Sequence, residues 1–568
     1  MTSAVPIAVH EEGADVQPLT MFGPDFPFPY DDYLAHPGGL GALPHAALGT
    51  EVAVIGGGLA GIVAAYELMR LGLKPVVYES GEIGGRLRST GFDGHEGIVA
   101  EMGAMRFPPA SRAFFHYVDG CGLRTEAFPN PLDDATQSTV VDMKGHKHYA
   151  CTLDELPPVY REVADAWQET LVTRARRDEM EDAIRARDAG RIKDIWNTLV
   201  PALDDQTFYG FLCDSPAFAS FAHRELFGQV GFGTGGWDTD FPNSVLEILR
   251  VVFTGADEQH VGIVGGCQQL PERLWTRTVD NAAHWPVGTS LASLHAGGRP
   301  RPGVTRLQRV GDGVRVEDAD GGSAHFPAVV YTAQGWMLLS RIDADEALLP
   351  IDHWTAIERT HYMGSSKLFV LVDRPFWKDK DPVTGRDVMS MTLTDRMTRG
   401  TYLLDQGDGK PGLMCLSYTW ADDSLKWLAL SCEERLEVML KSLGEIYPGV
   451  DIRSHIIAEP VTVSWETERD FMGAFKANLP GHYRYQERLF THFVQDDLAD
   501  GHKGFFLAGD DISWTAGWAE GAVQTAINAV WGVVHHLGGT AHPDNPGPGD
   551  RFAELAPLRL PDTWPPAP

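Results

Sequence analysis

The sequence lacks the features that mark membrane, secreted and metal- or disulfide-stabilised proteins. Its 568 residues include no apolar run near the roughly 18 residues that a membrane-spanning helix needs. The first residues, MTSAVPIAVHEEGADVQ, contain neither the basic nor the apolar segment of a secretory signal. The six cysteines are scattered without C-x-x-C pairs, which argues against a zinc site or a disulfide framework. We therefore expect a cytoplasmic protein with reduced cysteines, no bound metal and no membrane partner.

Positive charge is also scarce. The chain has 47 Lys and Arg against 78 Asp and Glu, a formal net charge of −31. Binding of nucleic acid requires Lys and Arg to neutralise phosphates, so this charge balance argues against nucleic acid as a partner. The acidic balance favours a cationic substrate, although a solvated acidic surface explains the same charge. A chain of this length can bury a large core and form two or three domains.

A nucleotide-binding pattern occupies the stretch EVAVIGGGLAGIVAAYELMRLGLKPVVYES. A short apolar strand precedes Gly56, Gly58 and Gly61, which have G-x-G-x-x-G spacing, and a helix is predicted over 60–71. A second apolar strand ends at Glu79. Glycines let the backbone approach a pyrophosphate, the helix N-terminus offers free N–H groups, and Glu79 can accept a hydrogen bond from a ribose hydroxyl. The pattern predicts a Rossmann-type dinucleotide-binding domain.

The residues after Glu79 point to a particular dinucleotide. Gly84, Gly85, Arg86 and Arg88 follow the acid closely, and their N–H and guanidinium donors could close over a second phosphate or a flavin edge. This pattern resembles the flavin amine oxidase superfamily, in which FAD rather than NAD occupies the fold. The resemblance covers nearly the whole chain.

The resemblance implies an α/β (α+β) fold: a Rossmann-type FAD-binding domain, a substrate-binding domain built on an antiparallel sheet, and a helical insertion. The expected boundaries are 49–110, 255–345 and 495–538 for the FAD-binding domain, 111–150, 204–254 and 346–494 for the substrate-binding domain, 151–203 for the helical insertion, and 1–48 and 539–568 for two terminal arms. The first arm is rich in aromatic residues and is expected to lie on the body or on a partner subunit. The second is rich in proline and is predicted to lack regular structure. The arms suggest exchange between subunits of a homodimer.

Residue patterns predict several further elements of this fold. They are a β-hairpin over 304–318, a buried strand over 326–333, a strand over 365–372 and a helix beginning near residue 243.

The segment EMGAMRFP, residues 101–108, resembles the bacterial amino-acid 2-monooxygenases within the superfamily. The resemblance implies that this segment passes close to the flavin ring, with Met105 at the cofactor. Arg106 would hold the α-carboxylate of an amino acid, a task for which a guanidinium fork is chemically suited. A structural Arg paired with a core carboxylate is the alternative.

The loop WDTDF places Asp238 and Asp240 beside Trp237 and Phe241. A loop carboxylate flanked by aromatic rings suits a cationic side chain, although Asp is also common in turns. The loop resembles the lysine-specific 2-monooxygenases more than the tryptophan-specific ones. This implies a basic L-amino acid substrate, lysine ahead of arginine or ornithine, with Asp240 as the first-choice ligand of its distal cation and Asp238 as the second.

The resemblance assigns roles to residues of the second half as well. Lys367 would hold a water near flavin N5, with an ordinary edge-strand lysine as the alternative. Trp518 would line an aromatic wall, and Phe475 would pack beside the substrate's side chain. The other residues expected at the cofactor are Trp465, Gly509, Asp510 and Ala519.

These roles imply transfer of hydride from Cα of the amino acid to flavin N5, followed by reaction with O2. Oxidative decarboxylation would give an amide, CO2 and water, and oxidative deamination would give a keto acid, ammonia and H2O2. An aromatic amino-acid 2-monooxygenase and a non-catalytic FAD-binding scaffold are the alternatives.

Overall fold

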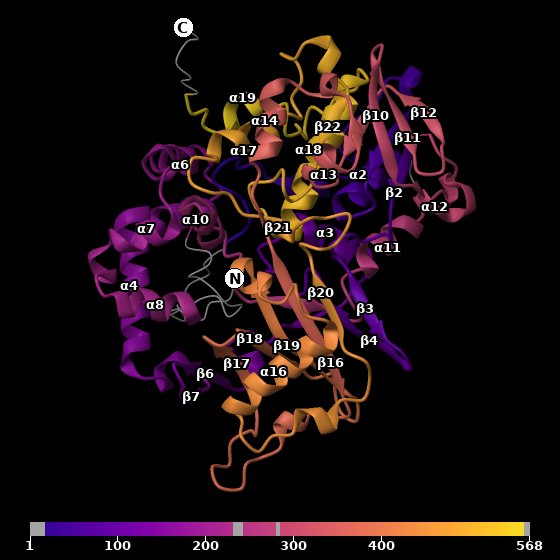
Figure 1. The fold of residues 1–568 in the computed structure, drawn as a ribbon. Helices are drawn as coiled ribbons and strands as arrows, with labels where there is room; N and C mark the ends of the chain where they lie inside the picture. Colours follow the sequence, from indigo (N-terminus) through magenta and orange to yellow (C-terminus); the bar gives the residue numbers. More distant parts are fainter. Residues whose placement is uncertain (1–17, 231–241, 280–283, 562–568) are drawn as a thin grey trace.

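The computed structural model describes residues 18–230, 242–279 and 284–561 (Figure 1). Two large sheets organise this part of the chain. Strands β2 and β22 of the first sheet lie in the upper half of Figure 1, and β16 to β20 of the second lie in the lower half. The mixed α/β fold agrees with the fold class predicted from the sequence.

The first sheet is parallel, with strand order β22-β13-β1-β2-β9. Its strands are β1 (Glu51–Ile55), β2 (Lys74–Glu79), β9 (Arg301–Pro302), β13 (Val329–Tyr331) and β22 (Phe505–Leu507). Continuous apolar runs form these strands because helices cover a parallel sheet on both faces. The predicted strand over 326–333 is wrong in its extent, since β12 ends at Phe326 and Pro327, which has no N–H to donate, separates it from β13.

Helix α2 (Leu59–Arg70) follows β1, as the glycine pattern predicted within one residue, and Gly72 has φ +94° just past its end. Gly56 has φ +111°, a left-handed conformation that glycine adopts without strain. A Cβ at Gly61 would lie 1.9 Å from the Gly56 carbonyl oxygen. The first turn of α2 therefore packs on the end of β1 at a distance that only glycine permits.

The second sheet has seven strands in the order β20-β16-β19-β18-β17-β6-β7. They are β6 (Thr139–Met143), β7 (His146–Ala150), β16 (Ser365–Val372), β17 (Met391–Thr394), β18 (Gly400–Leu404), β19 (Gly412–Trp420) and β20 (Val461–Ser464). The expectation of an antiparallel sheet is wrong at one junction, where β17 and β6 are parallel. No hairpin turn connects these two strands, so nothing local forces them to run in opposite directions. The edge-strand interpretation of Lys367 is also wrong, since β16 lies between β20 and β19.

Short sheets flank the two large ones. The four-stranded sheet has the order β12-β11-β10-β14, and β10 and β11 form the predicted hairpin. The strands of the short sheets are β3 (Ser89–Phe92), β4 (His95–Glu101), β5 (Thr125–Ala127), β8 (Val261–Ile263), β10 (Val304–Val310), β11 (Gly313–Asp318), β12 (Ser323–Phe326), β14 (Asp343–Ala344), β15 (Tyr362–Met363) and β21 (Phe475–Lys476).

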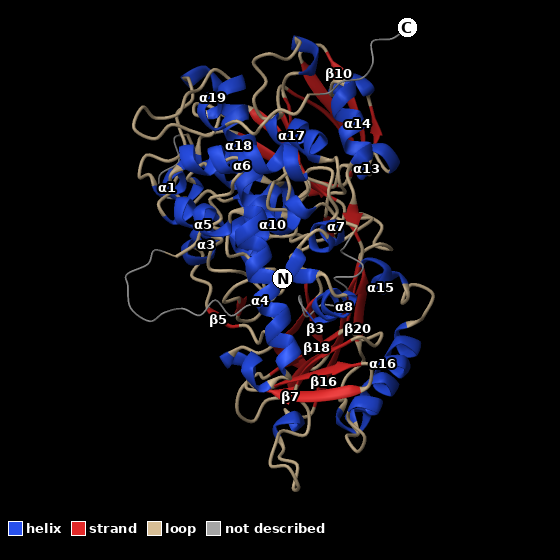
Figure 2. Cartoon of the chain, turned by 90° about the vertical axis from the view of Figure 1, so that its left-hand side faces the viewer, coloured by secondary structure: helices blue, strands red, loops and turns tan. Residues whose placement is uncertain are grey.

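A group of helices faces the viewer in Figure 2. It comprises α4 (Pro158–Ala175), α5 (Arg177–Arg185), α6 (Ala189–Leu203), α7 (Phe208–Cys213), α8 (Phe221–Val230) and α10 (Val245–Phe253). The other helices are α1 (Tyr30–Ala35), α3 (Arg112–Gly120), α11 (Gln269–Thr276), α12 (Leu291–Leu294), α13 (Trp336–Ser340), α14 (Ile351–Arg359), α15 (Ala421–Leu425), α16 (Cys432–Ile446), α17 (Tyr483–Thr491), α18 (Ala519–His536) and α19 (Phe552–Leu555). Helix α19 corrects the prediction that residues after 539 lack regular structure.

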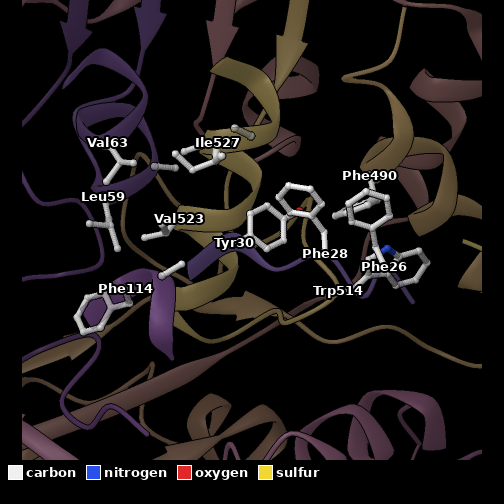
Figure 3. Close-up of a cluster of buried hydrophobic side chains, with 14 of the residues drawn as sticks. Phe26, Phe28, Tyr30, Leu59, Val63, Phe114, Phe490, Trp514, Val523 and Ile527 are labelled. Carbon is white, nitrogen blue, oxygen red and sulfur yellow. The ribbon is translucent and has the colours of Figure 1, made fainter. Parts of the chain in front are cut away.

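The aromatic segment near the N-terminus packs into the core of its own chain. Phe26 is buried, with its ring centroid 5.4 Å from that of Phe490 and 6.2 Å from that of Phe552 in α19. Figure 3 shows Phe26, Phe28 and Tyr30 in one cluster with residues of α2 and α18. The described part of the arm therefore lies on the body, one of its two predicted positions.

Candidate active site

One cavity is lined by residues of both large sheets. Most residues predicted at the cofactor or the substrate line it: Gly56, Gly58, Glu79, Gly85, Arg86, Met105, Arg106, Lys367, Trp465, Phe475, Gly509, Asp510, Trp518 and Ala519. Gly61 is not among the lining residues. Its contribution is to let α2 pack closely on the end of β1. Asp238 and Asp240 lie outside the described residues.

At the nucleotide end of the cavity, Glu79 and two glycines stand where β1, β2 and α2 meet. The Glu79 carboxylate accepts hydrogen bonds from the N–H groups of Gly57 at 2.6 Å and Gly81 at 2.7 Å. Burial raises the pKa of this carboxyl group. A Cβ at Gly85 would lie 3.1 Å from the Cα of Gly58, so these glycines let the two backbone segments approach each other closely. Carboxylate oxygens accept more than one hydrogen bond, so Glu79 can still bind a ribose hydroxyl.

Arg86 and Asp510 connect this end to the start of α18. The guanidinium forms an ion pair with Asp510, and its Nη1 donates to the Ala474 carbonyl oxygen at 2.9 Å. The carboxylate of Asp510 also accepts from the Gly517 N–H at 3.4 Å. An FAD pyrophosphate needs hydrogen-bond donors, and the backbone N–H groups beside the glycines and Arg86 supply them. The FAD ribose needs an acceptor, and Glu79 supplies it. The residues present therefore fit FAD, and those named here would hold it.

Lys367 also lines the cavity and is buried. Its Nζ donates to the carbonyl oxygens of Glu101, at 3.0 Å, and Gly103, and lies 4.5 Å from the ring centroid of Tyr418. Burial lowers the pKa of this ammonium group to about 8. An ammonium has three donors, so one N–H remains for a group in the cavity.

Arg106 is buried in the same cavity. Its Nη1 donates to the hydroxyl group of Tyr402 at 3.1 Å. Within the described ranges no carboxylate pairs with this guanidinium, so the interpretation of Arg106 as half of a structural ion pair gains no support there.

Aromatic rings form the walls around Lys367 and Arg106. The ring centroids of Trp420 and Phe475 are 5.3 Å apart, and Trp518 stacks on His260 at 5.5 Å. Burial lowers the pKa of His260 well below its ordinary value, so this imidazole is neutral. The inner cavity thus combines two cations with several aromatic side chains.

Four of these residues, Tyr402, Tyr418, Trp420 and His260, were not predicted as site residues. Tyr418 and Trp420 are two positions apart in β19, on one face of the strand, and Tyr418 pairs with Lys367. The alternation of aromatic residues in the sequence LSYTW could have indicated that both rings lie on the same face of a strand. The sequence gives no comparable signal for Tyr402 or His260.

The described residues contain neither a candidate membrane-spanning helix nor a candidate metal site. Among these residues no helix is long and apolar enough to cross a bilayer. The same residues bring together no group of three or more His, Cys, Asp or Glu that could hold a metal ion.

Comparisons with known proteins find similarity over most of the chain. The profile of the family described as flavin-containing amine oxidoreductase matches residues 59–534. The tryptophan 2-monooxygenase of Pseudomonas savastanoi is 31% identical over 547 residues, 90% of this chain and 94% of that protein. An L-amino-acid oxidase of Siganus canaliculatus is 24% identical over 517 residues, 86% of each chain.

Two solved structures share the fold. Wild-type putrescine oxidase bound to putrescine aligns with a TM-score of 0.62 and 20% identity, over 84% of this chain and 97% of that one. Cyclohexylamine oxidase from Brevibacterium oxydans IH-35A aligns with a TM-score of 0.59 and 17% identity, over 86% of this chain and 99% of that one.

Proposed function

The chain belongs to the flavin-containing amine oxidoreductase family and is FAD-dependent, and we propose that its substrate is an L-α-amino acid. The observation that carries this proposal is Arg106. It is a buried guanidinium in the cavity, and no described residue gives it a carboxylate partner. A buried charge without a counter-charge is costly, so a ligand that supplies a carboxylate binds there favourably.

Bound FAD supplies the two-electron acceptor for oxidation of the Cα–N bond. The residues of this chain position the amino acid: Arg106 binds the α-carboxylate, and its bond to Tyr402 fixes the direction of the guanidinium. Lys367 uses its remaining N–H to hold a water or an oxygen species. The aromatic walls exclude bulk water from the inner cavity.

The overall reaction has two possible outcomes. In oxidative deamination, the amino acid, O2 and water give a keto acid, ammonia and H2O2. In oxidative decarboxylation, the amino acid and O2 give an amide, CO2 and water. The second outcome requires that water stay out until the carboxylate is lost, which depends on closure of the site.

For the side chain of the substrate we propose a basic group, with lysine ahead of arginine or ornithine. The acids Asp238 and Asp240 in the loop WDTDF support this proposal. An aspartate beside aromatic rings binds a cation by charge pairing. A neutral indole would leave the aspartate without a counter-charge. The net charge of −31 would also attract a cationic substrate.

An aromatic L-amino acid is the second candidate. The names of the relatives favour it, because the proteins about 30% identical to this chain are tryptophan 2-monooxygenases. The wall formed by Trp420, Phe475 and Trp518 also suits an aromatic ring. The comparisons thus give more support to this candidate than to the basic one.

Anaerobic mixing of the purified, yellow protein with single amino acids tests both candidates. Reduction of the flavin bleaches its visible absorbance, and the rate is followed with L-lysine, L-arginine, L-ornithine, L-tryptophan and L-phenylalanine. Fast bleaching by lysine or its basic relatives supports the first candidate. Bleaching by aromatic amino acids alone supports the second, and no bleaching by any amino acid would indicate a non-catalytic scaffold.

We also propose the domain boundaries given above and a cytoplasmic homodimer. These proposals rest on the sequence. Light scattering on the purified protein measures the mass in solution, and a monomer would rule out the dimer.

A further inference from the structure

A second cavity lies on the far side of Met105. It is bounded by strands of the seven-stranded sheet, by β4, and by the paired strands β5 and β8. Met105 lines this second cavity and also the cavity that holds the cofactor and the substrate. Met105 is therefore part of the wall between the two.

The second cavity has a buried apolar part and an exposed polar part. Its buried lining residues include Met105, Phe128, Phe369, Met391 and Leu413. Its exposed lining residues include Glu126, Lys378 and Asp405. The exposed polar residues face solvent, and Met105 is one of the buried apolar residues.

Glu101 also lines the second cavity, but its carboxylate is already bonded. It accepts hydrogen bonds from the N–H of Cys267 at 2.7 Å and from the hydroxyl group of Ser89 at 2.7 Å. Its backbone carbonyl oxygen accepts from Lys367 Nζ at 3.0 Å. The buried part of the cavity thus offers a small molecule apolar contacts, and the Glu101 carboxylate is not available to bind it.

We propose that this second cavity is the path by which O2 reaches the reduced cofactor. The inference rests on the proposed function, because it needs a cofactor that O2 reoxidises. O2 is small, neutral and apolar, so it passes methionine, leucine and phenylalanine side chains without losing hydrogen bonds. A zwitterionic amino acid would lose its hydration there without compensation. A separate path also lets O2 arrive while an amino acid or its product fills the first cavity.

Gly262, in β8, gives a means to narrow this path. A Cβ at Gly262 would meet the Met105 carbonyl oxygen at 3.8 Å and Phe128 Cδ2 at 3.9 Å, both ordinary contacts. The φ angle of Gly262 lies outside the left-handed region, so other residues are tolerated. Gly262→Leu therefore places a side chain beside Met105 without displacing the backbone.

Gly444, in α16, is the matched control. A Cβ there meets nothing within 4 Å, and α16 packs on the opposite face of the seven-stranded sheet from Phe369 and Leu413. Gly444→Leu adds the same side chain away from the cavity. A second variant, Ala135→Trp, narrows the exposed part of the cavity and is tolerated because Ala135 is exposed.

The experiment mixes dithionite-reduced holoenzyme with O2 in a stopped-flow instrument, so that no amino acid is involved. We expect the second-order rate constant of reoxidation to fall about tenfold in Gly262→Leu, to fall in Ala135→Trp, and to stay unchanged in Gly444→Leu. Anaerobic reduction by the amino acid should be unchanged in all three. In crystals pressurised with xenon, which binds in apolar cavities, we expect xenon near Met105 in the wild type and none in Gly262→Leu.

Unchanged reoxidation in both cavity variants would overturn the inference, and so would an equal slowing of reduction and reoxidation. Absence of xenon from the wild-type cavity would also count against it. If no amino acid reduces the wild type but the variants still slow reoxidation, the proposed substrate is wrong while the path for O2 stands.

Discussion

Lys367 is a buried cation whose proton affinity makes stability depend on pH. Below about pH 8 it is charged in both the folded and unfolded states, and burial penalises the folded one. Between about pH 8 and the ordinary lysine value of about 10.4, the folded protein has lost this proton and the unfolded chain keeps it. The unfolded state then binds more protons, so the free energy of unfolding rises with pH across this window.

Comparison with Lys367→Met isolates this effect, since other titrating groups are common to both proteins. We expect the melting temperature of the wild type to rise relative to that of the variant as the pH increases from about 8 to about 10. A difference that stays constant over this range would show that the Lys367 pKa is not lowered in the fold.

Asp240 decides between the two proposed substrate classes. If it binds the distal cation, Asp240→Asn should weaken binding of L-lysine by roughly 10- to 100-fold, the value of a hydrogen bond to a charged group. Binding of an aromatic amino acid should not change. Asp238→Asn is the matched variant, with a smaller expected effect. Dissociation constants come from the dependence of flavin bleaching on substrate concentration, and equal effects on both substrate classes would remove Asp240 from the proposal.

At the scale of elements, the contact between α2 and β1 sets the nucleotide end of the site. Gly61→Ala would place a methyl group 1.9 Å from the Gly56 carbonyl oxygen, so the helix must move. We expect a loss of about 1–3 kcal/mol in the free energy of unfolding, as for other overpacked sites, and release of FAD during gel filtration. Gly444→Ala in α16, where a Cβ meets nothing, should instead stabilise the protein by about 0.5–1 kcal/mol. Retention of FAD in Gly61→Ala would contradict the role given to this contact.

The elements around the glycine pattern were predictable because each is specified by a contiguous stretch. The apolar strand, the glycines and the acid of the dinucleotide unit all lie within residues 51–79, and the structure places α2 within one residue of its prediction. The parallel pairing of β17 with β6 was not predictable in this way. It joins segments about 250 residues apart, and no local pattern specifies such a partner.

At the scale of the whole molecule, the aromatic segment near the N-terminus closes the core. Phe26 contacts Phe490, Phe493 and Phe552, which come from the last part of the chain. Phe26→Ala should lower the free energy of unfolding by about 3–5 kcal/mol, the usual cost of a large core truncation. Phe221→Ala is the control, because this side chain is exposed and its loss should change stability by less than about 0.5 kcal/mol. Equal effects in denaturant titrations would mean that the segment does not contribute to the core.

The inner site includes contacts between residues far apart in the chain, which the sequence alone does not predict. Arg106 and Lys367 could be named in advance because each stands in a motif that resembles those of relatives. Tyr402, the partner of Arg106, is 296 positions away and stands in a strand without a distinctive pattern. Such a contact exists only after the seven-stranded sheet has formed against the cofactor-binding part.

The most direct test of the central claim, that Arg106 binds an α-carboxylate, compares amino acids with their decarboxylated amines. L-lysine is compared with cadaverine, and L-tryptophan with tryptamine, in anaerobic reduction of the wild type, of Arg106→Met and of the exposed control Arg374→Met. We predict that the wild type and the control are reduced much faster by the amino acid than by its amine. Arg106→Met should lose that preference because only its rate with the amino acid falls. Equal rates with amine and amino acid in the wild type, or a preference that survives in Arg106→Met, would contradict the account.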